Sequence, residues 1–180
     1  MKENEIAIVG GAGFVGSRLT ARFNKGSVFS NRYDIDLTNE LDRGIYLDVE
    51  DVGSLNKLAG VGTIINLAAV HRDDVRPLSR YDDVNVQGAK NICEAASKHG
   101  INKIIFTSSV AIYGFAPADT DESGVPNYFN DYGRTKYLAE QVYKAWQLED
   151  PESRTLVIVR PAVIFGEGNR GNVYNLLRKI

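Results

Sequence analysis

The chain has 180 residues, of which 43% are hydrophobic, 24% charged and 9% aromatic. This length suits one globular domain, and the composition is that of a folded protein rather than a disordered or fibrous one. The formal net charge of -2 supplies no basic field for a nucleic acid, because phosphate backbones are bound by clustered lysine and arginine side chains.

The first residues are not expected to form a signal peptide. Met1 to Glu5 are mostly polar and lead directly into a short apolar run, without the long apolar core of a signal peptide. No stretch approaches the ~20 apolar residues of a membrane span. Cys93, the single cysteine, lies among apolar positions of a helical pattern and is interpreted as a buried structural thiol. We expect a cytoplasmic protein without nucleic-acid or membrane partners.

Short β-branched runs alternate with helical patterns, which is typical of βαβ units around a parallel sheet. Four runs are nearly continuously apolar, which predicts strands covered by helices on both faces. Strands are predicted at residues 6–9, 63–67, 103–107 and 155–159, with two weaker ones at 33–35 and 45–47. The fold class is therefore α/β, with a doubly wound parallel sheet.

Helical patterns fill the intervals between these strands. Two of them end at Gly26 and Gly100, as expected because glycine tolerates the positive φ found just past a helix end. Proline and glycine mark residues 116–130 as a loop. The predicted helices cover residues 14–25, 84–99, 132–147 and 171–180.

A glycine-rich turn, Gly10 to Gly16, links the first strand to the first helix, with glycines at 10, 13 and 16. Such a turn needs one glycine for its tight bend, one for the approach of a pyrophosphate and one for close helix packing, with the helix N-terminus facing the anion. The flanking strand and helix favour this interpretation over an ordinary turn.

An acidic residue about 20 positions later would hold the adenosine ribose. Asp34 lies 18 residues after Gly16 and Asp36 lies 20 after it, and the sequence does not separate them or exclude a solvated carboxylate. An acid here repels a 2′-phosphate, so NAD is favoured, although Arg32 leaves NADP open.

Tyr132 and Lys136 lie one helical turn apart on the same face. A neighbouring cation favours the phenolate, and lowering a tyrosine pKa from ~10 toward ~7 needs about 4 kcal/mol. The pair favours Tyr132 as a base near neutral pH, but a tyrosine and a lysine at this spacing also occur by chance, so the pair by itself is weak evidence. Ser108 and Ser109 follow a predicted strand, where ligands bind in open α/β sheets, although serines there are often turn formers.

These motifs occur in the order and spacing of the extended short-chain dehydrogenases/reductases, and the chain resembles their NAD-dependent epimerase/dehydratase group from Ile6 to about Gly168. The resemblance implies a Rossmann-like fold and is specific for the superfamily but much less so for the substrate. It rests on Gly10-x-x-Gly13-x-x-Gly16, Ser108-Ser109-x-x-Ile112-Tyr113-Gly114, Tyr132-x-x-x-Lys136 and Arg160 to Gly166.

The resemblance implies that Tyr132 removes a proton from a sugar hydroxyl while hydride moves to the nicotinamide. Lys136 would lower the pKa of Tyr132 and hold the nicotinamide ribose, and Ser109 would hydrogen-bond the reacting oxygen. No metal is implied. The implied cofactor shell, for which core or capping roles are the alternative, comprises Gly10, Gly13, Phe14, Val15, Gly16, Asp34 or Asp36, Asp48, Val49, Leu67, Ala68, Ala69, Asn85, Tyr132, Lys136, Pro161 and Val163.

One departure from the group limits the types of reaction that we expect. Sugar dehydratases carry an Asp-Glu pair after the hydroxyl residue, whereas Ser109 is followed by Val110-Ala111. This favours epimerisation, or simple oxidation and reduction, of a nucleotide-activated sugar. Two rivals are a non-catalytic NAD-binding sensor or scaffold, against which the retained catalytic residues argue, and a reductase of small non-sugar carbonyls. The charged run 71–74 either reaches substrate phosphates or forms a solvated loop.

Members of the group continue into a smaller C-terminal substrate domain, which residues 1–180 are expected to lack. We therefore expect the chain to be the NAD-binding domain, able to hold NAD but inactive on sugars by itself, because remote contacts orient the reacting carbon. The sequence does not decide whether the protein forms a homodimer. Apolar side chains at Val173, Leu176, Leu177 and Ile180 predict weak self-association.

Overall fold

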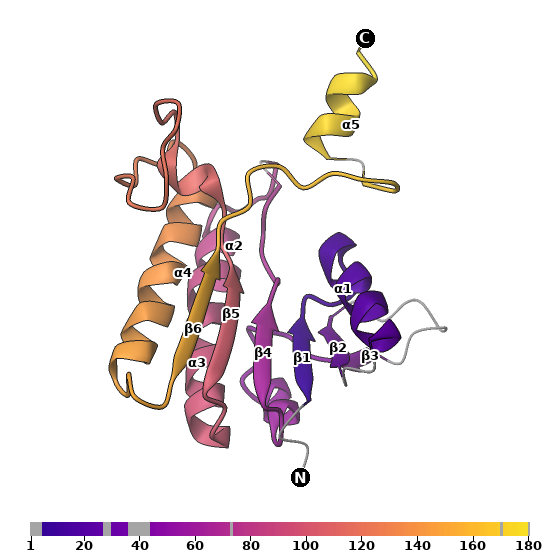
Figure 1. Cartoon of the computed structure of the whole chain (residues 1–180), viewed down its shortest axis with the longest axis vertical. Helices are drawn as coiled ribbons and strands as arrows, with labels where there is room; N and C mark the ends of the chain where they lie inside the picture. Colours follow the sequence, from indigo (N-terminus) through magenta and orange to yellow (C-terminus); the bar gives the residue numbers. More distant parts are fainter. Residues whose placement is uncertain (1–4, 27–29, 36–43, 73, 170, 180) are drawn as a thin grey trace.

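A computed structural model describes residues 5–26, 30–35, 44–72, 74–169 and 171–179. Six parallel strands form one sheet in the order β3-β2-β1-β4-β5-β6, which confirms the predicted doubly wound α/β fold (Figure 1). Because the chain leaves β1 toward one edge and returns to β4 on its other side, a ligand crevice is expected beyond the carboxyl ends of these two strands. The strands are β1 (Ile6–Val9), β2 (Ser30–Asp34), β3 (Gly44–Tyr46), β4 (Thr63–Asn66), β5 (Lys103–Thr107) and β6 (Thr155–Val159).

Helices cover the two faces unequally. Helix α1 (Phe14–Lys25) lies on one face, and α3 (Gly88–His99) and α4 (Asp131–Leu148) lie on the other with the short helix η1 (Ser54–Leu58) (Figure 1). The main core forms beneath α3 and α4, and α1 buries only Gly16. Large side chains of this main core include Tyr33, Leu55, Leu58, Ile64, Ile92, Ile104, Phe106, Tyr143 and Trp146.

The unequal cover corrects the expectation that all four apolar strands are enclosed on both sides. Val157 and Val159 of β6 are 45% and 44% exposed, whereas Leu156 and Ile158 pack against the core. β6 is an edge strand with α4 on one side, and α1 lies at the far end of the sheet (Figure 1). An apolar run therefore identified the strand but not the cover on its second face.

The helix predicted at 84–99 begins earlier than expected. A turn of α2 (Ser79–Tyr81) continues into a π-helical segment, η2 (Asp82–Gln87), and then into α3, which ends at Gly100 with φ 67°. Wider π-type turns occur often at functional sites. This segment turns the Asn85 side chain inward, where it is buried.

The remaining elements match the predictions within a few residues. Residues 115–130 form a loop, preceded by the short helix η3 (Val110–Tyr113), and the chain continues to α5 (Asn172–Leu177). Cys93 is a buried free thiol, as expected. Among the residues that the structure describes, no helix is long and apolar enough to span a membrane.

Candidate active site

The glycine-rich turn lies where β1 and β4 separate. The amides of Gly10 and Gly11 donate to the Tyr33 carbonyl over 2.9 and 3.2 Å, which ties the turn to β2. Gly10 has φ +76°, and a Cβ there would lie 2.7 Å from the Ala68 amide nitrogen. A side chain at this position would therefore be strained and would collide with the chain that follows β4.

Gly13 differs from Gly10, because a Cβ on it would meet only one protein atom within 4 Å. A Cβ on Gly13 would meet Gly10 O at 3.3 Å, and Gly13 is exposed at the start of α1 with no side chain capping that helix. Uncapped amides at a helix N-terminus attract an anion. These features fit the pyrophosphate of a dinucleotide, and Phe14, Val15 and Gly16 continue the same helix turn.

Asp34 lies at the carboxyl end of β2 and accepts a hydrogen bond from the Ala12 amide over 2.8 Å. The carboxylate is thereby held beside the glycine turn, where a ribose attached to the pyrophosphate would come. Asp36, the alternative, lies outside the described residues.

The pair Asp48 and Val49 forms a tight turn after β3. Asp48 Oδ1 accepts from the Glu50 amide over 2.9 Å, and the Val49 carbonyl accepts from Asn91 Nδ2 over 2.8 Å. Asn91, buried on α3, was not singled out from the sequence, because a single asparagine within a helical pattern has no distinguishing signal. The Asn91 hydrogen bond thus holds this turn against α3, and a turn held in this way can serve as a surface for a flat ring such as adenine.

Residues 67–70 cross the carboxyl end of β4 beside the glycine turn, and Leu67 N donates to Val9 O over 2.8 Å. Asn85 holds this segment: its Oδ1 accepts from Val70 N over 2.8 Å, and its Nδ2 donates to Val70 O over 3.0 Å and to Thr135 Oγ1 over 2.9 Å. The side chain of Asn85, which the sequence placed in the cofactor shell, therefore holds residues 67–70 and α4 in position. Ala68 and Ala69 are half-buried, and their small side chains project little from this edge.

The predicted catalytic side chains meet at the carboxyl end of β5. Ser109 precedes η3 and is nearly buried, and its Oγ accepts from the Ala111 amide over 3.1 Å. Tyr132 and Lys136 lie on the first turns of α4, which Asn130 caps by accepting from Gly133 N over 2.8 Å. The Ser109 hydroxyl acts on the pKa of Tyr132 as a hydrogen-bonding group, so the two side chains lie close to each other. The structure thus brings Ser109 to the tyrosine that the sequence paired with Lys136.

Lys136 is completely enclosed, with its Nζ 4.5 Å from the centroid of the Phe106 ring. Burial lowers the pKa of Lys136 to about 7, and the charge of Glu140 opposes this shift. Burial also raises the pKa of Tyr132, and the hydrogen bond from Ser109 opposes that rise. Burial and Ser109 account for the shift of the Tyr132 pKa in this arrangement, and the expected lowering of that pKa by Lys136 stays a prediction.

The segment after β6 crosses above the carboxyl edge toward α1 (Figure 1). It is anchored at both ends, by Val110 N donating to Pro161 O over 3.2 Å and by Arg18 Nη2 donating to Glu167 O. Val163, between the anchors, is 58% exposed. Pro161 and Val163 therefore lie on a strap that links the catalytic side of the crevice to the phosphate side.

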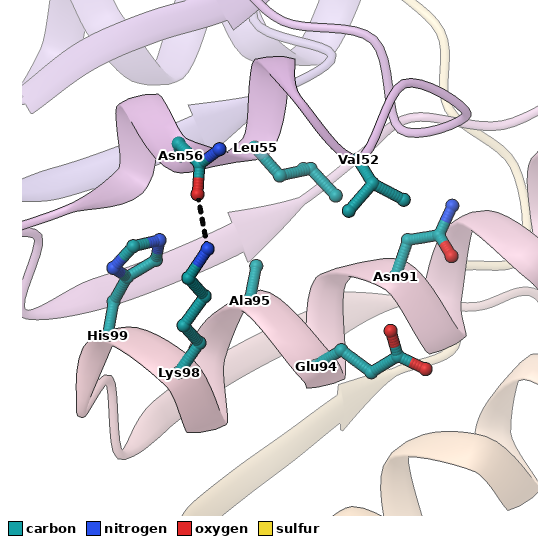
Figure 2. Close-up of a pocket in the computed structure, with 8 residues that line it drawn as sticks. All are labelled: Val52, Leu55, Asn56, Asn91, Glu94, Ala95, Lys98 and His99. Carbon is teal, nitrogen blue, oxygen red and sulfur yellow. Dashed lines mark hydrogen bonds between the residues drawn. The ribbon is translucent and has the colours of Figure 1, made fainter.

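Two further features lie apart from this constellation. A small pocket between η1 and the second half of α3, where Lys98 donates to Asn56, is shown in Figure 2 and contains none of the predicted site residues. Arg72 and Asp74, from the charged run 71–74, pair with each other over 2.8 Å and are about 70% exposed, as a solvated loop would be. Within the described part of the chain, no cluster of side chains suits a metal ion.

Comparison with known proteins agrees with this geometry. The chain is 45% identical, over its whole length, to 54% of an N-acetyl-α-D-glucosaminyl-diphospho-ditrans,octacis-undecaprenol 4-epimerase of Escherichia coli O157:H7. It is 27% identical, over 97% of its length, to 56% of a UDP-glucose 4-epimerase of Vibrio cholerae. The chain thus spans about half the length of the curated relatives it matches.

A solved structure and a family model give the same result. The UDP-glucose 4-epimerase of Brucella ovis, crystallised with NAD, superposes with a TM-score of 0.77 over 87% of this chain and 51% of its own, at 27% identity. The model of the NAD dependent epimerase/dehydratase family matches residues 6–180. With a fold, a glycine turn and a Ser-Tyr-Lys constellation of this kind, the chain belongs to the NAD dependent epimerase/dehydratase family.

Proposed function

We propose that the protein to which this chain belongs is an NAD-dependent 4-epimerase of a sugar activated by a diphosphate. The observation that carries the proposal is the meeting of Ser109, Tyr132 and Lys136 at the edge of the sheet that also holds the glycine turn. The 4-epimerases among the relatives support the reaction. The absence of an acid at Val110-Ala111 removes the side chains that an elimination would use.

Bound NAD would supply a hydride acceptor that returns the hydride to the opposite face of the sugar. Tyr132 would take the proton of the sugar hydroxyl, with Ser109 aligning the same oxygen. Lys136, one turn further along α4, would stabilise the phenolate with its positive charge. Asp34, the glycine turn, Asp48-Val49, residues 67–69 and the strap at Pro161 and Val163 would hold the cofactor along the crevice.

Within the proposed function, we assign the substrate to the polyprenyl-diphosphate sugars rather than to the nucleotide sugars. The relative at 45% identity carries such a substrate in its name, whereas the relative named for UDP-glucose is 27% identical. A second support lies beside the catalytic helix. Phe115 and Phe129 are 87% and 60% exposed and stack with their ring centroids 4.8 Å apart, on the loop that leads into Tyr132. Exposed apolar patches of this kind mark lipid or protein contacts.

The test is a comparison of two substrates on the full-length protein in one detergent buffer. N-acetylglucosaminyl-diphospho-polyprenol and UDP-N-acetylglucosamine are offered separately, and conversion at C4 is measured. We expect kcat/KM to be at least about 10-fold higher for the lipid-linked sugar, equivalent to about 1.4 kcal/mol. A preference for the UDP-sugar would overturn the substrate assignment, and no conversion of either sugar would overturn the proposed function.

A double substitution, Phe115→Ser with Phe129→Ser, tests the role of the aromatic pair. It should lower kcat/KM for the lipid-linked sugar while leaving NAD affinity unchanged. The matched control is Leu148→Ser, which removes a 73% exposed apolar side chain at the opposite end of α4. Equal effects of the two changes would show that the aromatic pair has no specific contact with the lipid.

A further inference from the structure

Glu140 is a buried carboxylate on the catalytic helix that the roles above leave unused. It follows Lys136 by one helical turn and is 0% exposed. Its two oxygens accept from Arg160 in a forked arrangement, over 2.9 Å from Nε and 2.7 Å from Nη2, and Lys144 Nζ lies 3.8 Å away at the helix surface. Burying such a pair costs desolvation free energy, so stability alone is a weak reason for its presence.

Arg160 carries this contact beyond α4. Its Nη1 donates to the Tyr113 hydroxyl and, over 3.0 Å, to the Glu122 carbonyl. Tyr113 ends η3, the short helix that Ser109 caps, and Glu122 belongs to the loop 115–130. One guanidinium therefore joins the catalytic helix, the end of β6, the Ser109 segment and the loop.

The charge on Lys136 depends on the groups that face it. On its own helix are Tyr132, whose pKa burial raises, and Glu140, whose charge raises the pKa of Lys136. From β5 it meets the Phe106 ring. Arg160, which directly follows β6, and Lys144 contact the Glu140 carboxylate, and Tyr113, from η3, contacts Arg160. Glu140 is thus the anion available to a lysine that burial would otherwise neutralise.

We propose that Glu140, held by Arg160, is a positioning residue of the active site, whose buried carboxylate one helical turn from Lys136 favours the ammonium form of that lysine. The proposal rests on the catalytic roles given to Tyr132 and Lys136 in the proposed function. Arg160 is the second positioning residue, because it sets the orientation of the carboxylate and connects it to the Ser109 segment.

The test compares Glu140→Gln, Arg160→Gln and the surface control Lys144→Gln in the full-length enzyme. Without Glu140, Lys136 loses the negative charge one helical turn away and gives up its proton more readily, so the alkaline limb of the kcat profile should move to lower pH by about one pH unit or more. Without Arg160, the Glu140 carboxylate has no guanidinium to offset its charge and stabilises the Lys136 ammonium more strongly. The alkaline limb of the kcat profile should therefore move to higher pH. Lys144→Gln should leave the limb in place, because that ammonium is exposed.

A second readout is independent of turnover. The ε-carbon of Lys136, labelled with 13C and assigned through Lys136→Arg, is titrated by NMR in the same proteins. Its midpoint should fall in Glu140→Gln and rise in Arg160→Gln. Unchanged midpoints, with activity reduced equally at every pH, would show that the pair is only structural and would overturn the proposal. An enzyme inactive on all sugars would instead refute the proposed function, since the titration remains readable.

If the single variants do not fold, the double variant Glu140→Gln/Arg160→Gln replaces them, because it leaves no lone buried charge. Its Lys136 midpoint should lie below that of the wild type, since the lost Glu140 carboxylate is the charge that raises the pKa of Lys136. A midpoint equal to that of the wild type would overturn the proposal.

Discussion

The phosphate side and the catalytic side of the crevice are built in different ways. At the glycine turn the shape comes from the backbone: the Gly10 and Gly11 amides donate to the Tyr33 carbonyl, and a Cβ on Gly13 would meet only Gly10 O. At the catalytic end it comes from buried polar side chains, in which Asn85 and Glu140 hold α4 to other segments. Backbone shape depends on a few local residues, whereas a side-chain network depends on partners far apart in the sequence.

The largest expected effect falls on the catalytic side. In the full-length enzyme, Tyr132→Phe removes the hydroxyl that would carry the proton and should lower kcat by about 100-fold or more while leaving NAD affinity nearly unchanged. Steady-state kinetics and calorimetric NAD titration check the two halves of this prediction. A parallel loss of NAD binding would mean that Tyr132 serves the cofactor site rather than the chemistry.

The phosphate side can be divided by two glycine substitutions. Gly10→Ala places a side chain at φ +76° and 2.7 Å from the Ala68 nitrogen, and it should lower the free energy of unfolding by about 1–3 kcal/mol or more. Gly13→Ala should change stability less than Gly10→Ala and weaken NAD binding, because its methyl group meets only Gly10 O, at 3.3 Å, and lies where the pyrophosphate is expected. Urea unfolding and NAD titration separate the two, and normal NAD binding by Gly13→Ala would contradict the phosphate assignment.

The enclosed lysine gives a pH dependence of stability. Burial lowers the pKa of Lys136 to about 7, below an unfolded value of about 10.4, so the unfolded chain binds more protons between these values and stability rises with pH. The rise should reach about 1–2 kcal/mol between about pH 7 and pH 8.5, before Cys93, whose pKa burial raises to about 12, begins to act in the opposite sense. Lys136→Met should remove the rise, and an equal slope in both proteins would contradict it.

The smallest effect is expected at the exposed pair Arg72 and Asp74. Arg72→Gln should change neither the unfolding midpoint nor kcat measurably, because both side chains are about 70% exposed and water screens their attraction. A clear rise in KM for a diphosphate-linked sugar would instead assign the loop a phosphate contact, the alternative that the sequence leaves open.

Prediction from the sequence was most successful where one segment carries the whole signal. The strands, the helix after the glycine turn and the helix ends before Gly26 and Gly100 follow from short patterns and were confirmed within a few residues. The positive φ expected at both glycines is found at Gly100 but not at Gly26, whose φ is −91°. The family expected from four spaced motifs, and NAD as the cofactor of that family, were confirmed as well. The individual cofactor and catalytic residues remain predictions that the experiments above can decide.

Local periodicity and glycine spacing were sufficient for the fold class, and the i, i+4 spacing for predicting that Tyr132 and Lys136 share a helix face, because each pattern lies within one stretch of chain. The partners of those residues were decided only by tertiary packing: Asn85 meets Thr135 across 50 positions, and Glu140 meets Arg160 across 20. The same holds for the open face of β6 and the raised pKa of Tyr132. Burial and electrostatic fields depend on what distant segments bring to a point in space, and no local pattern records that.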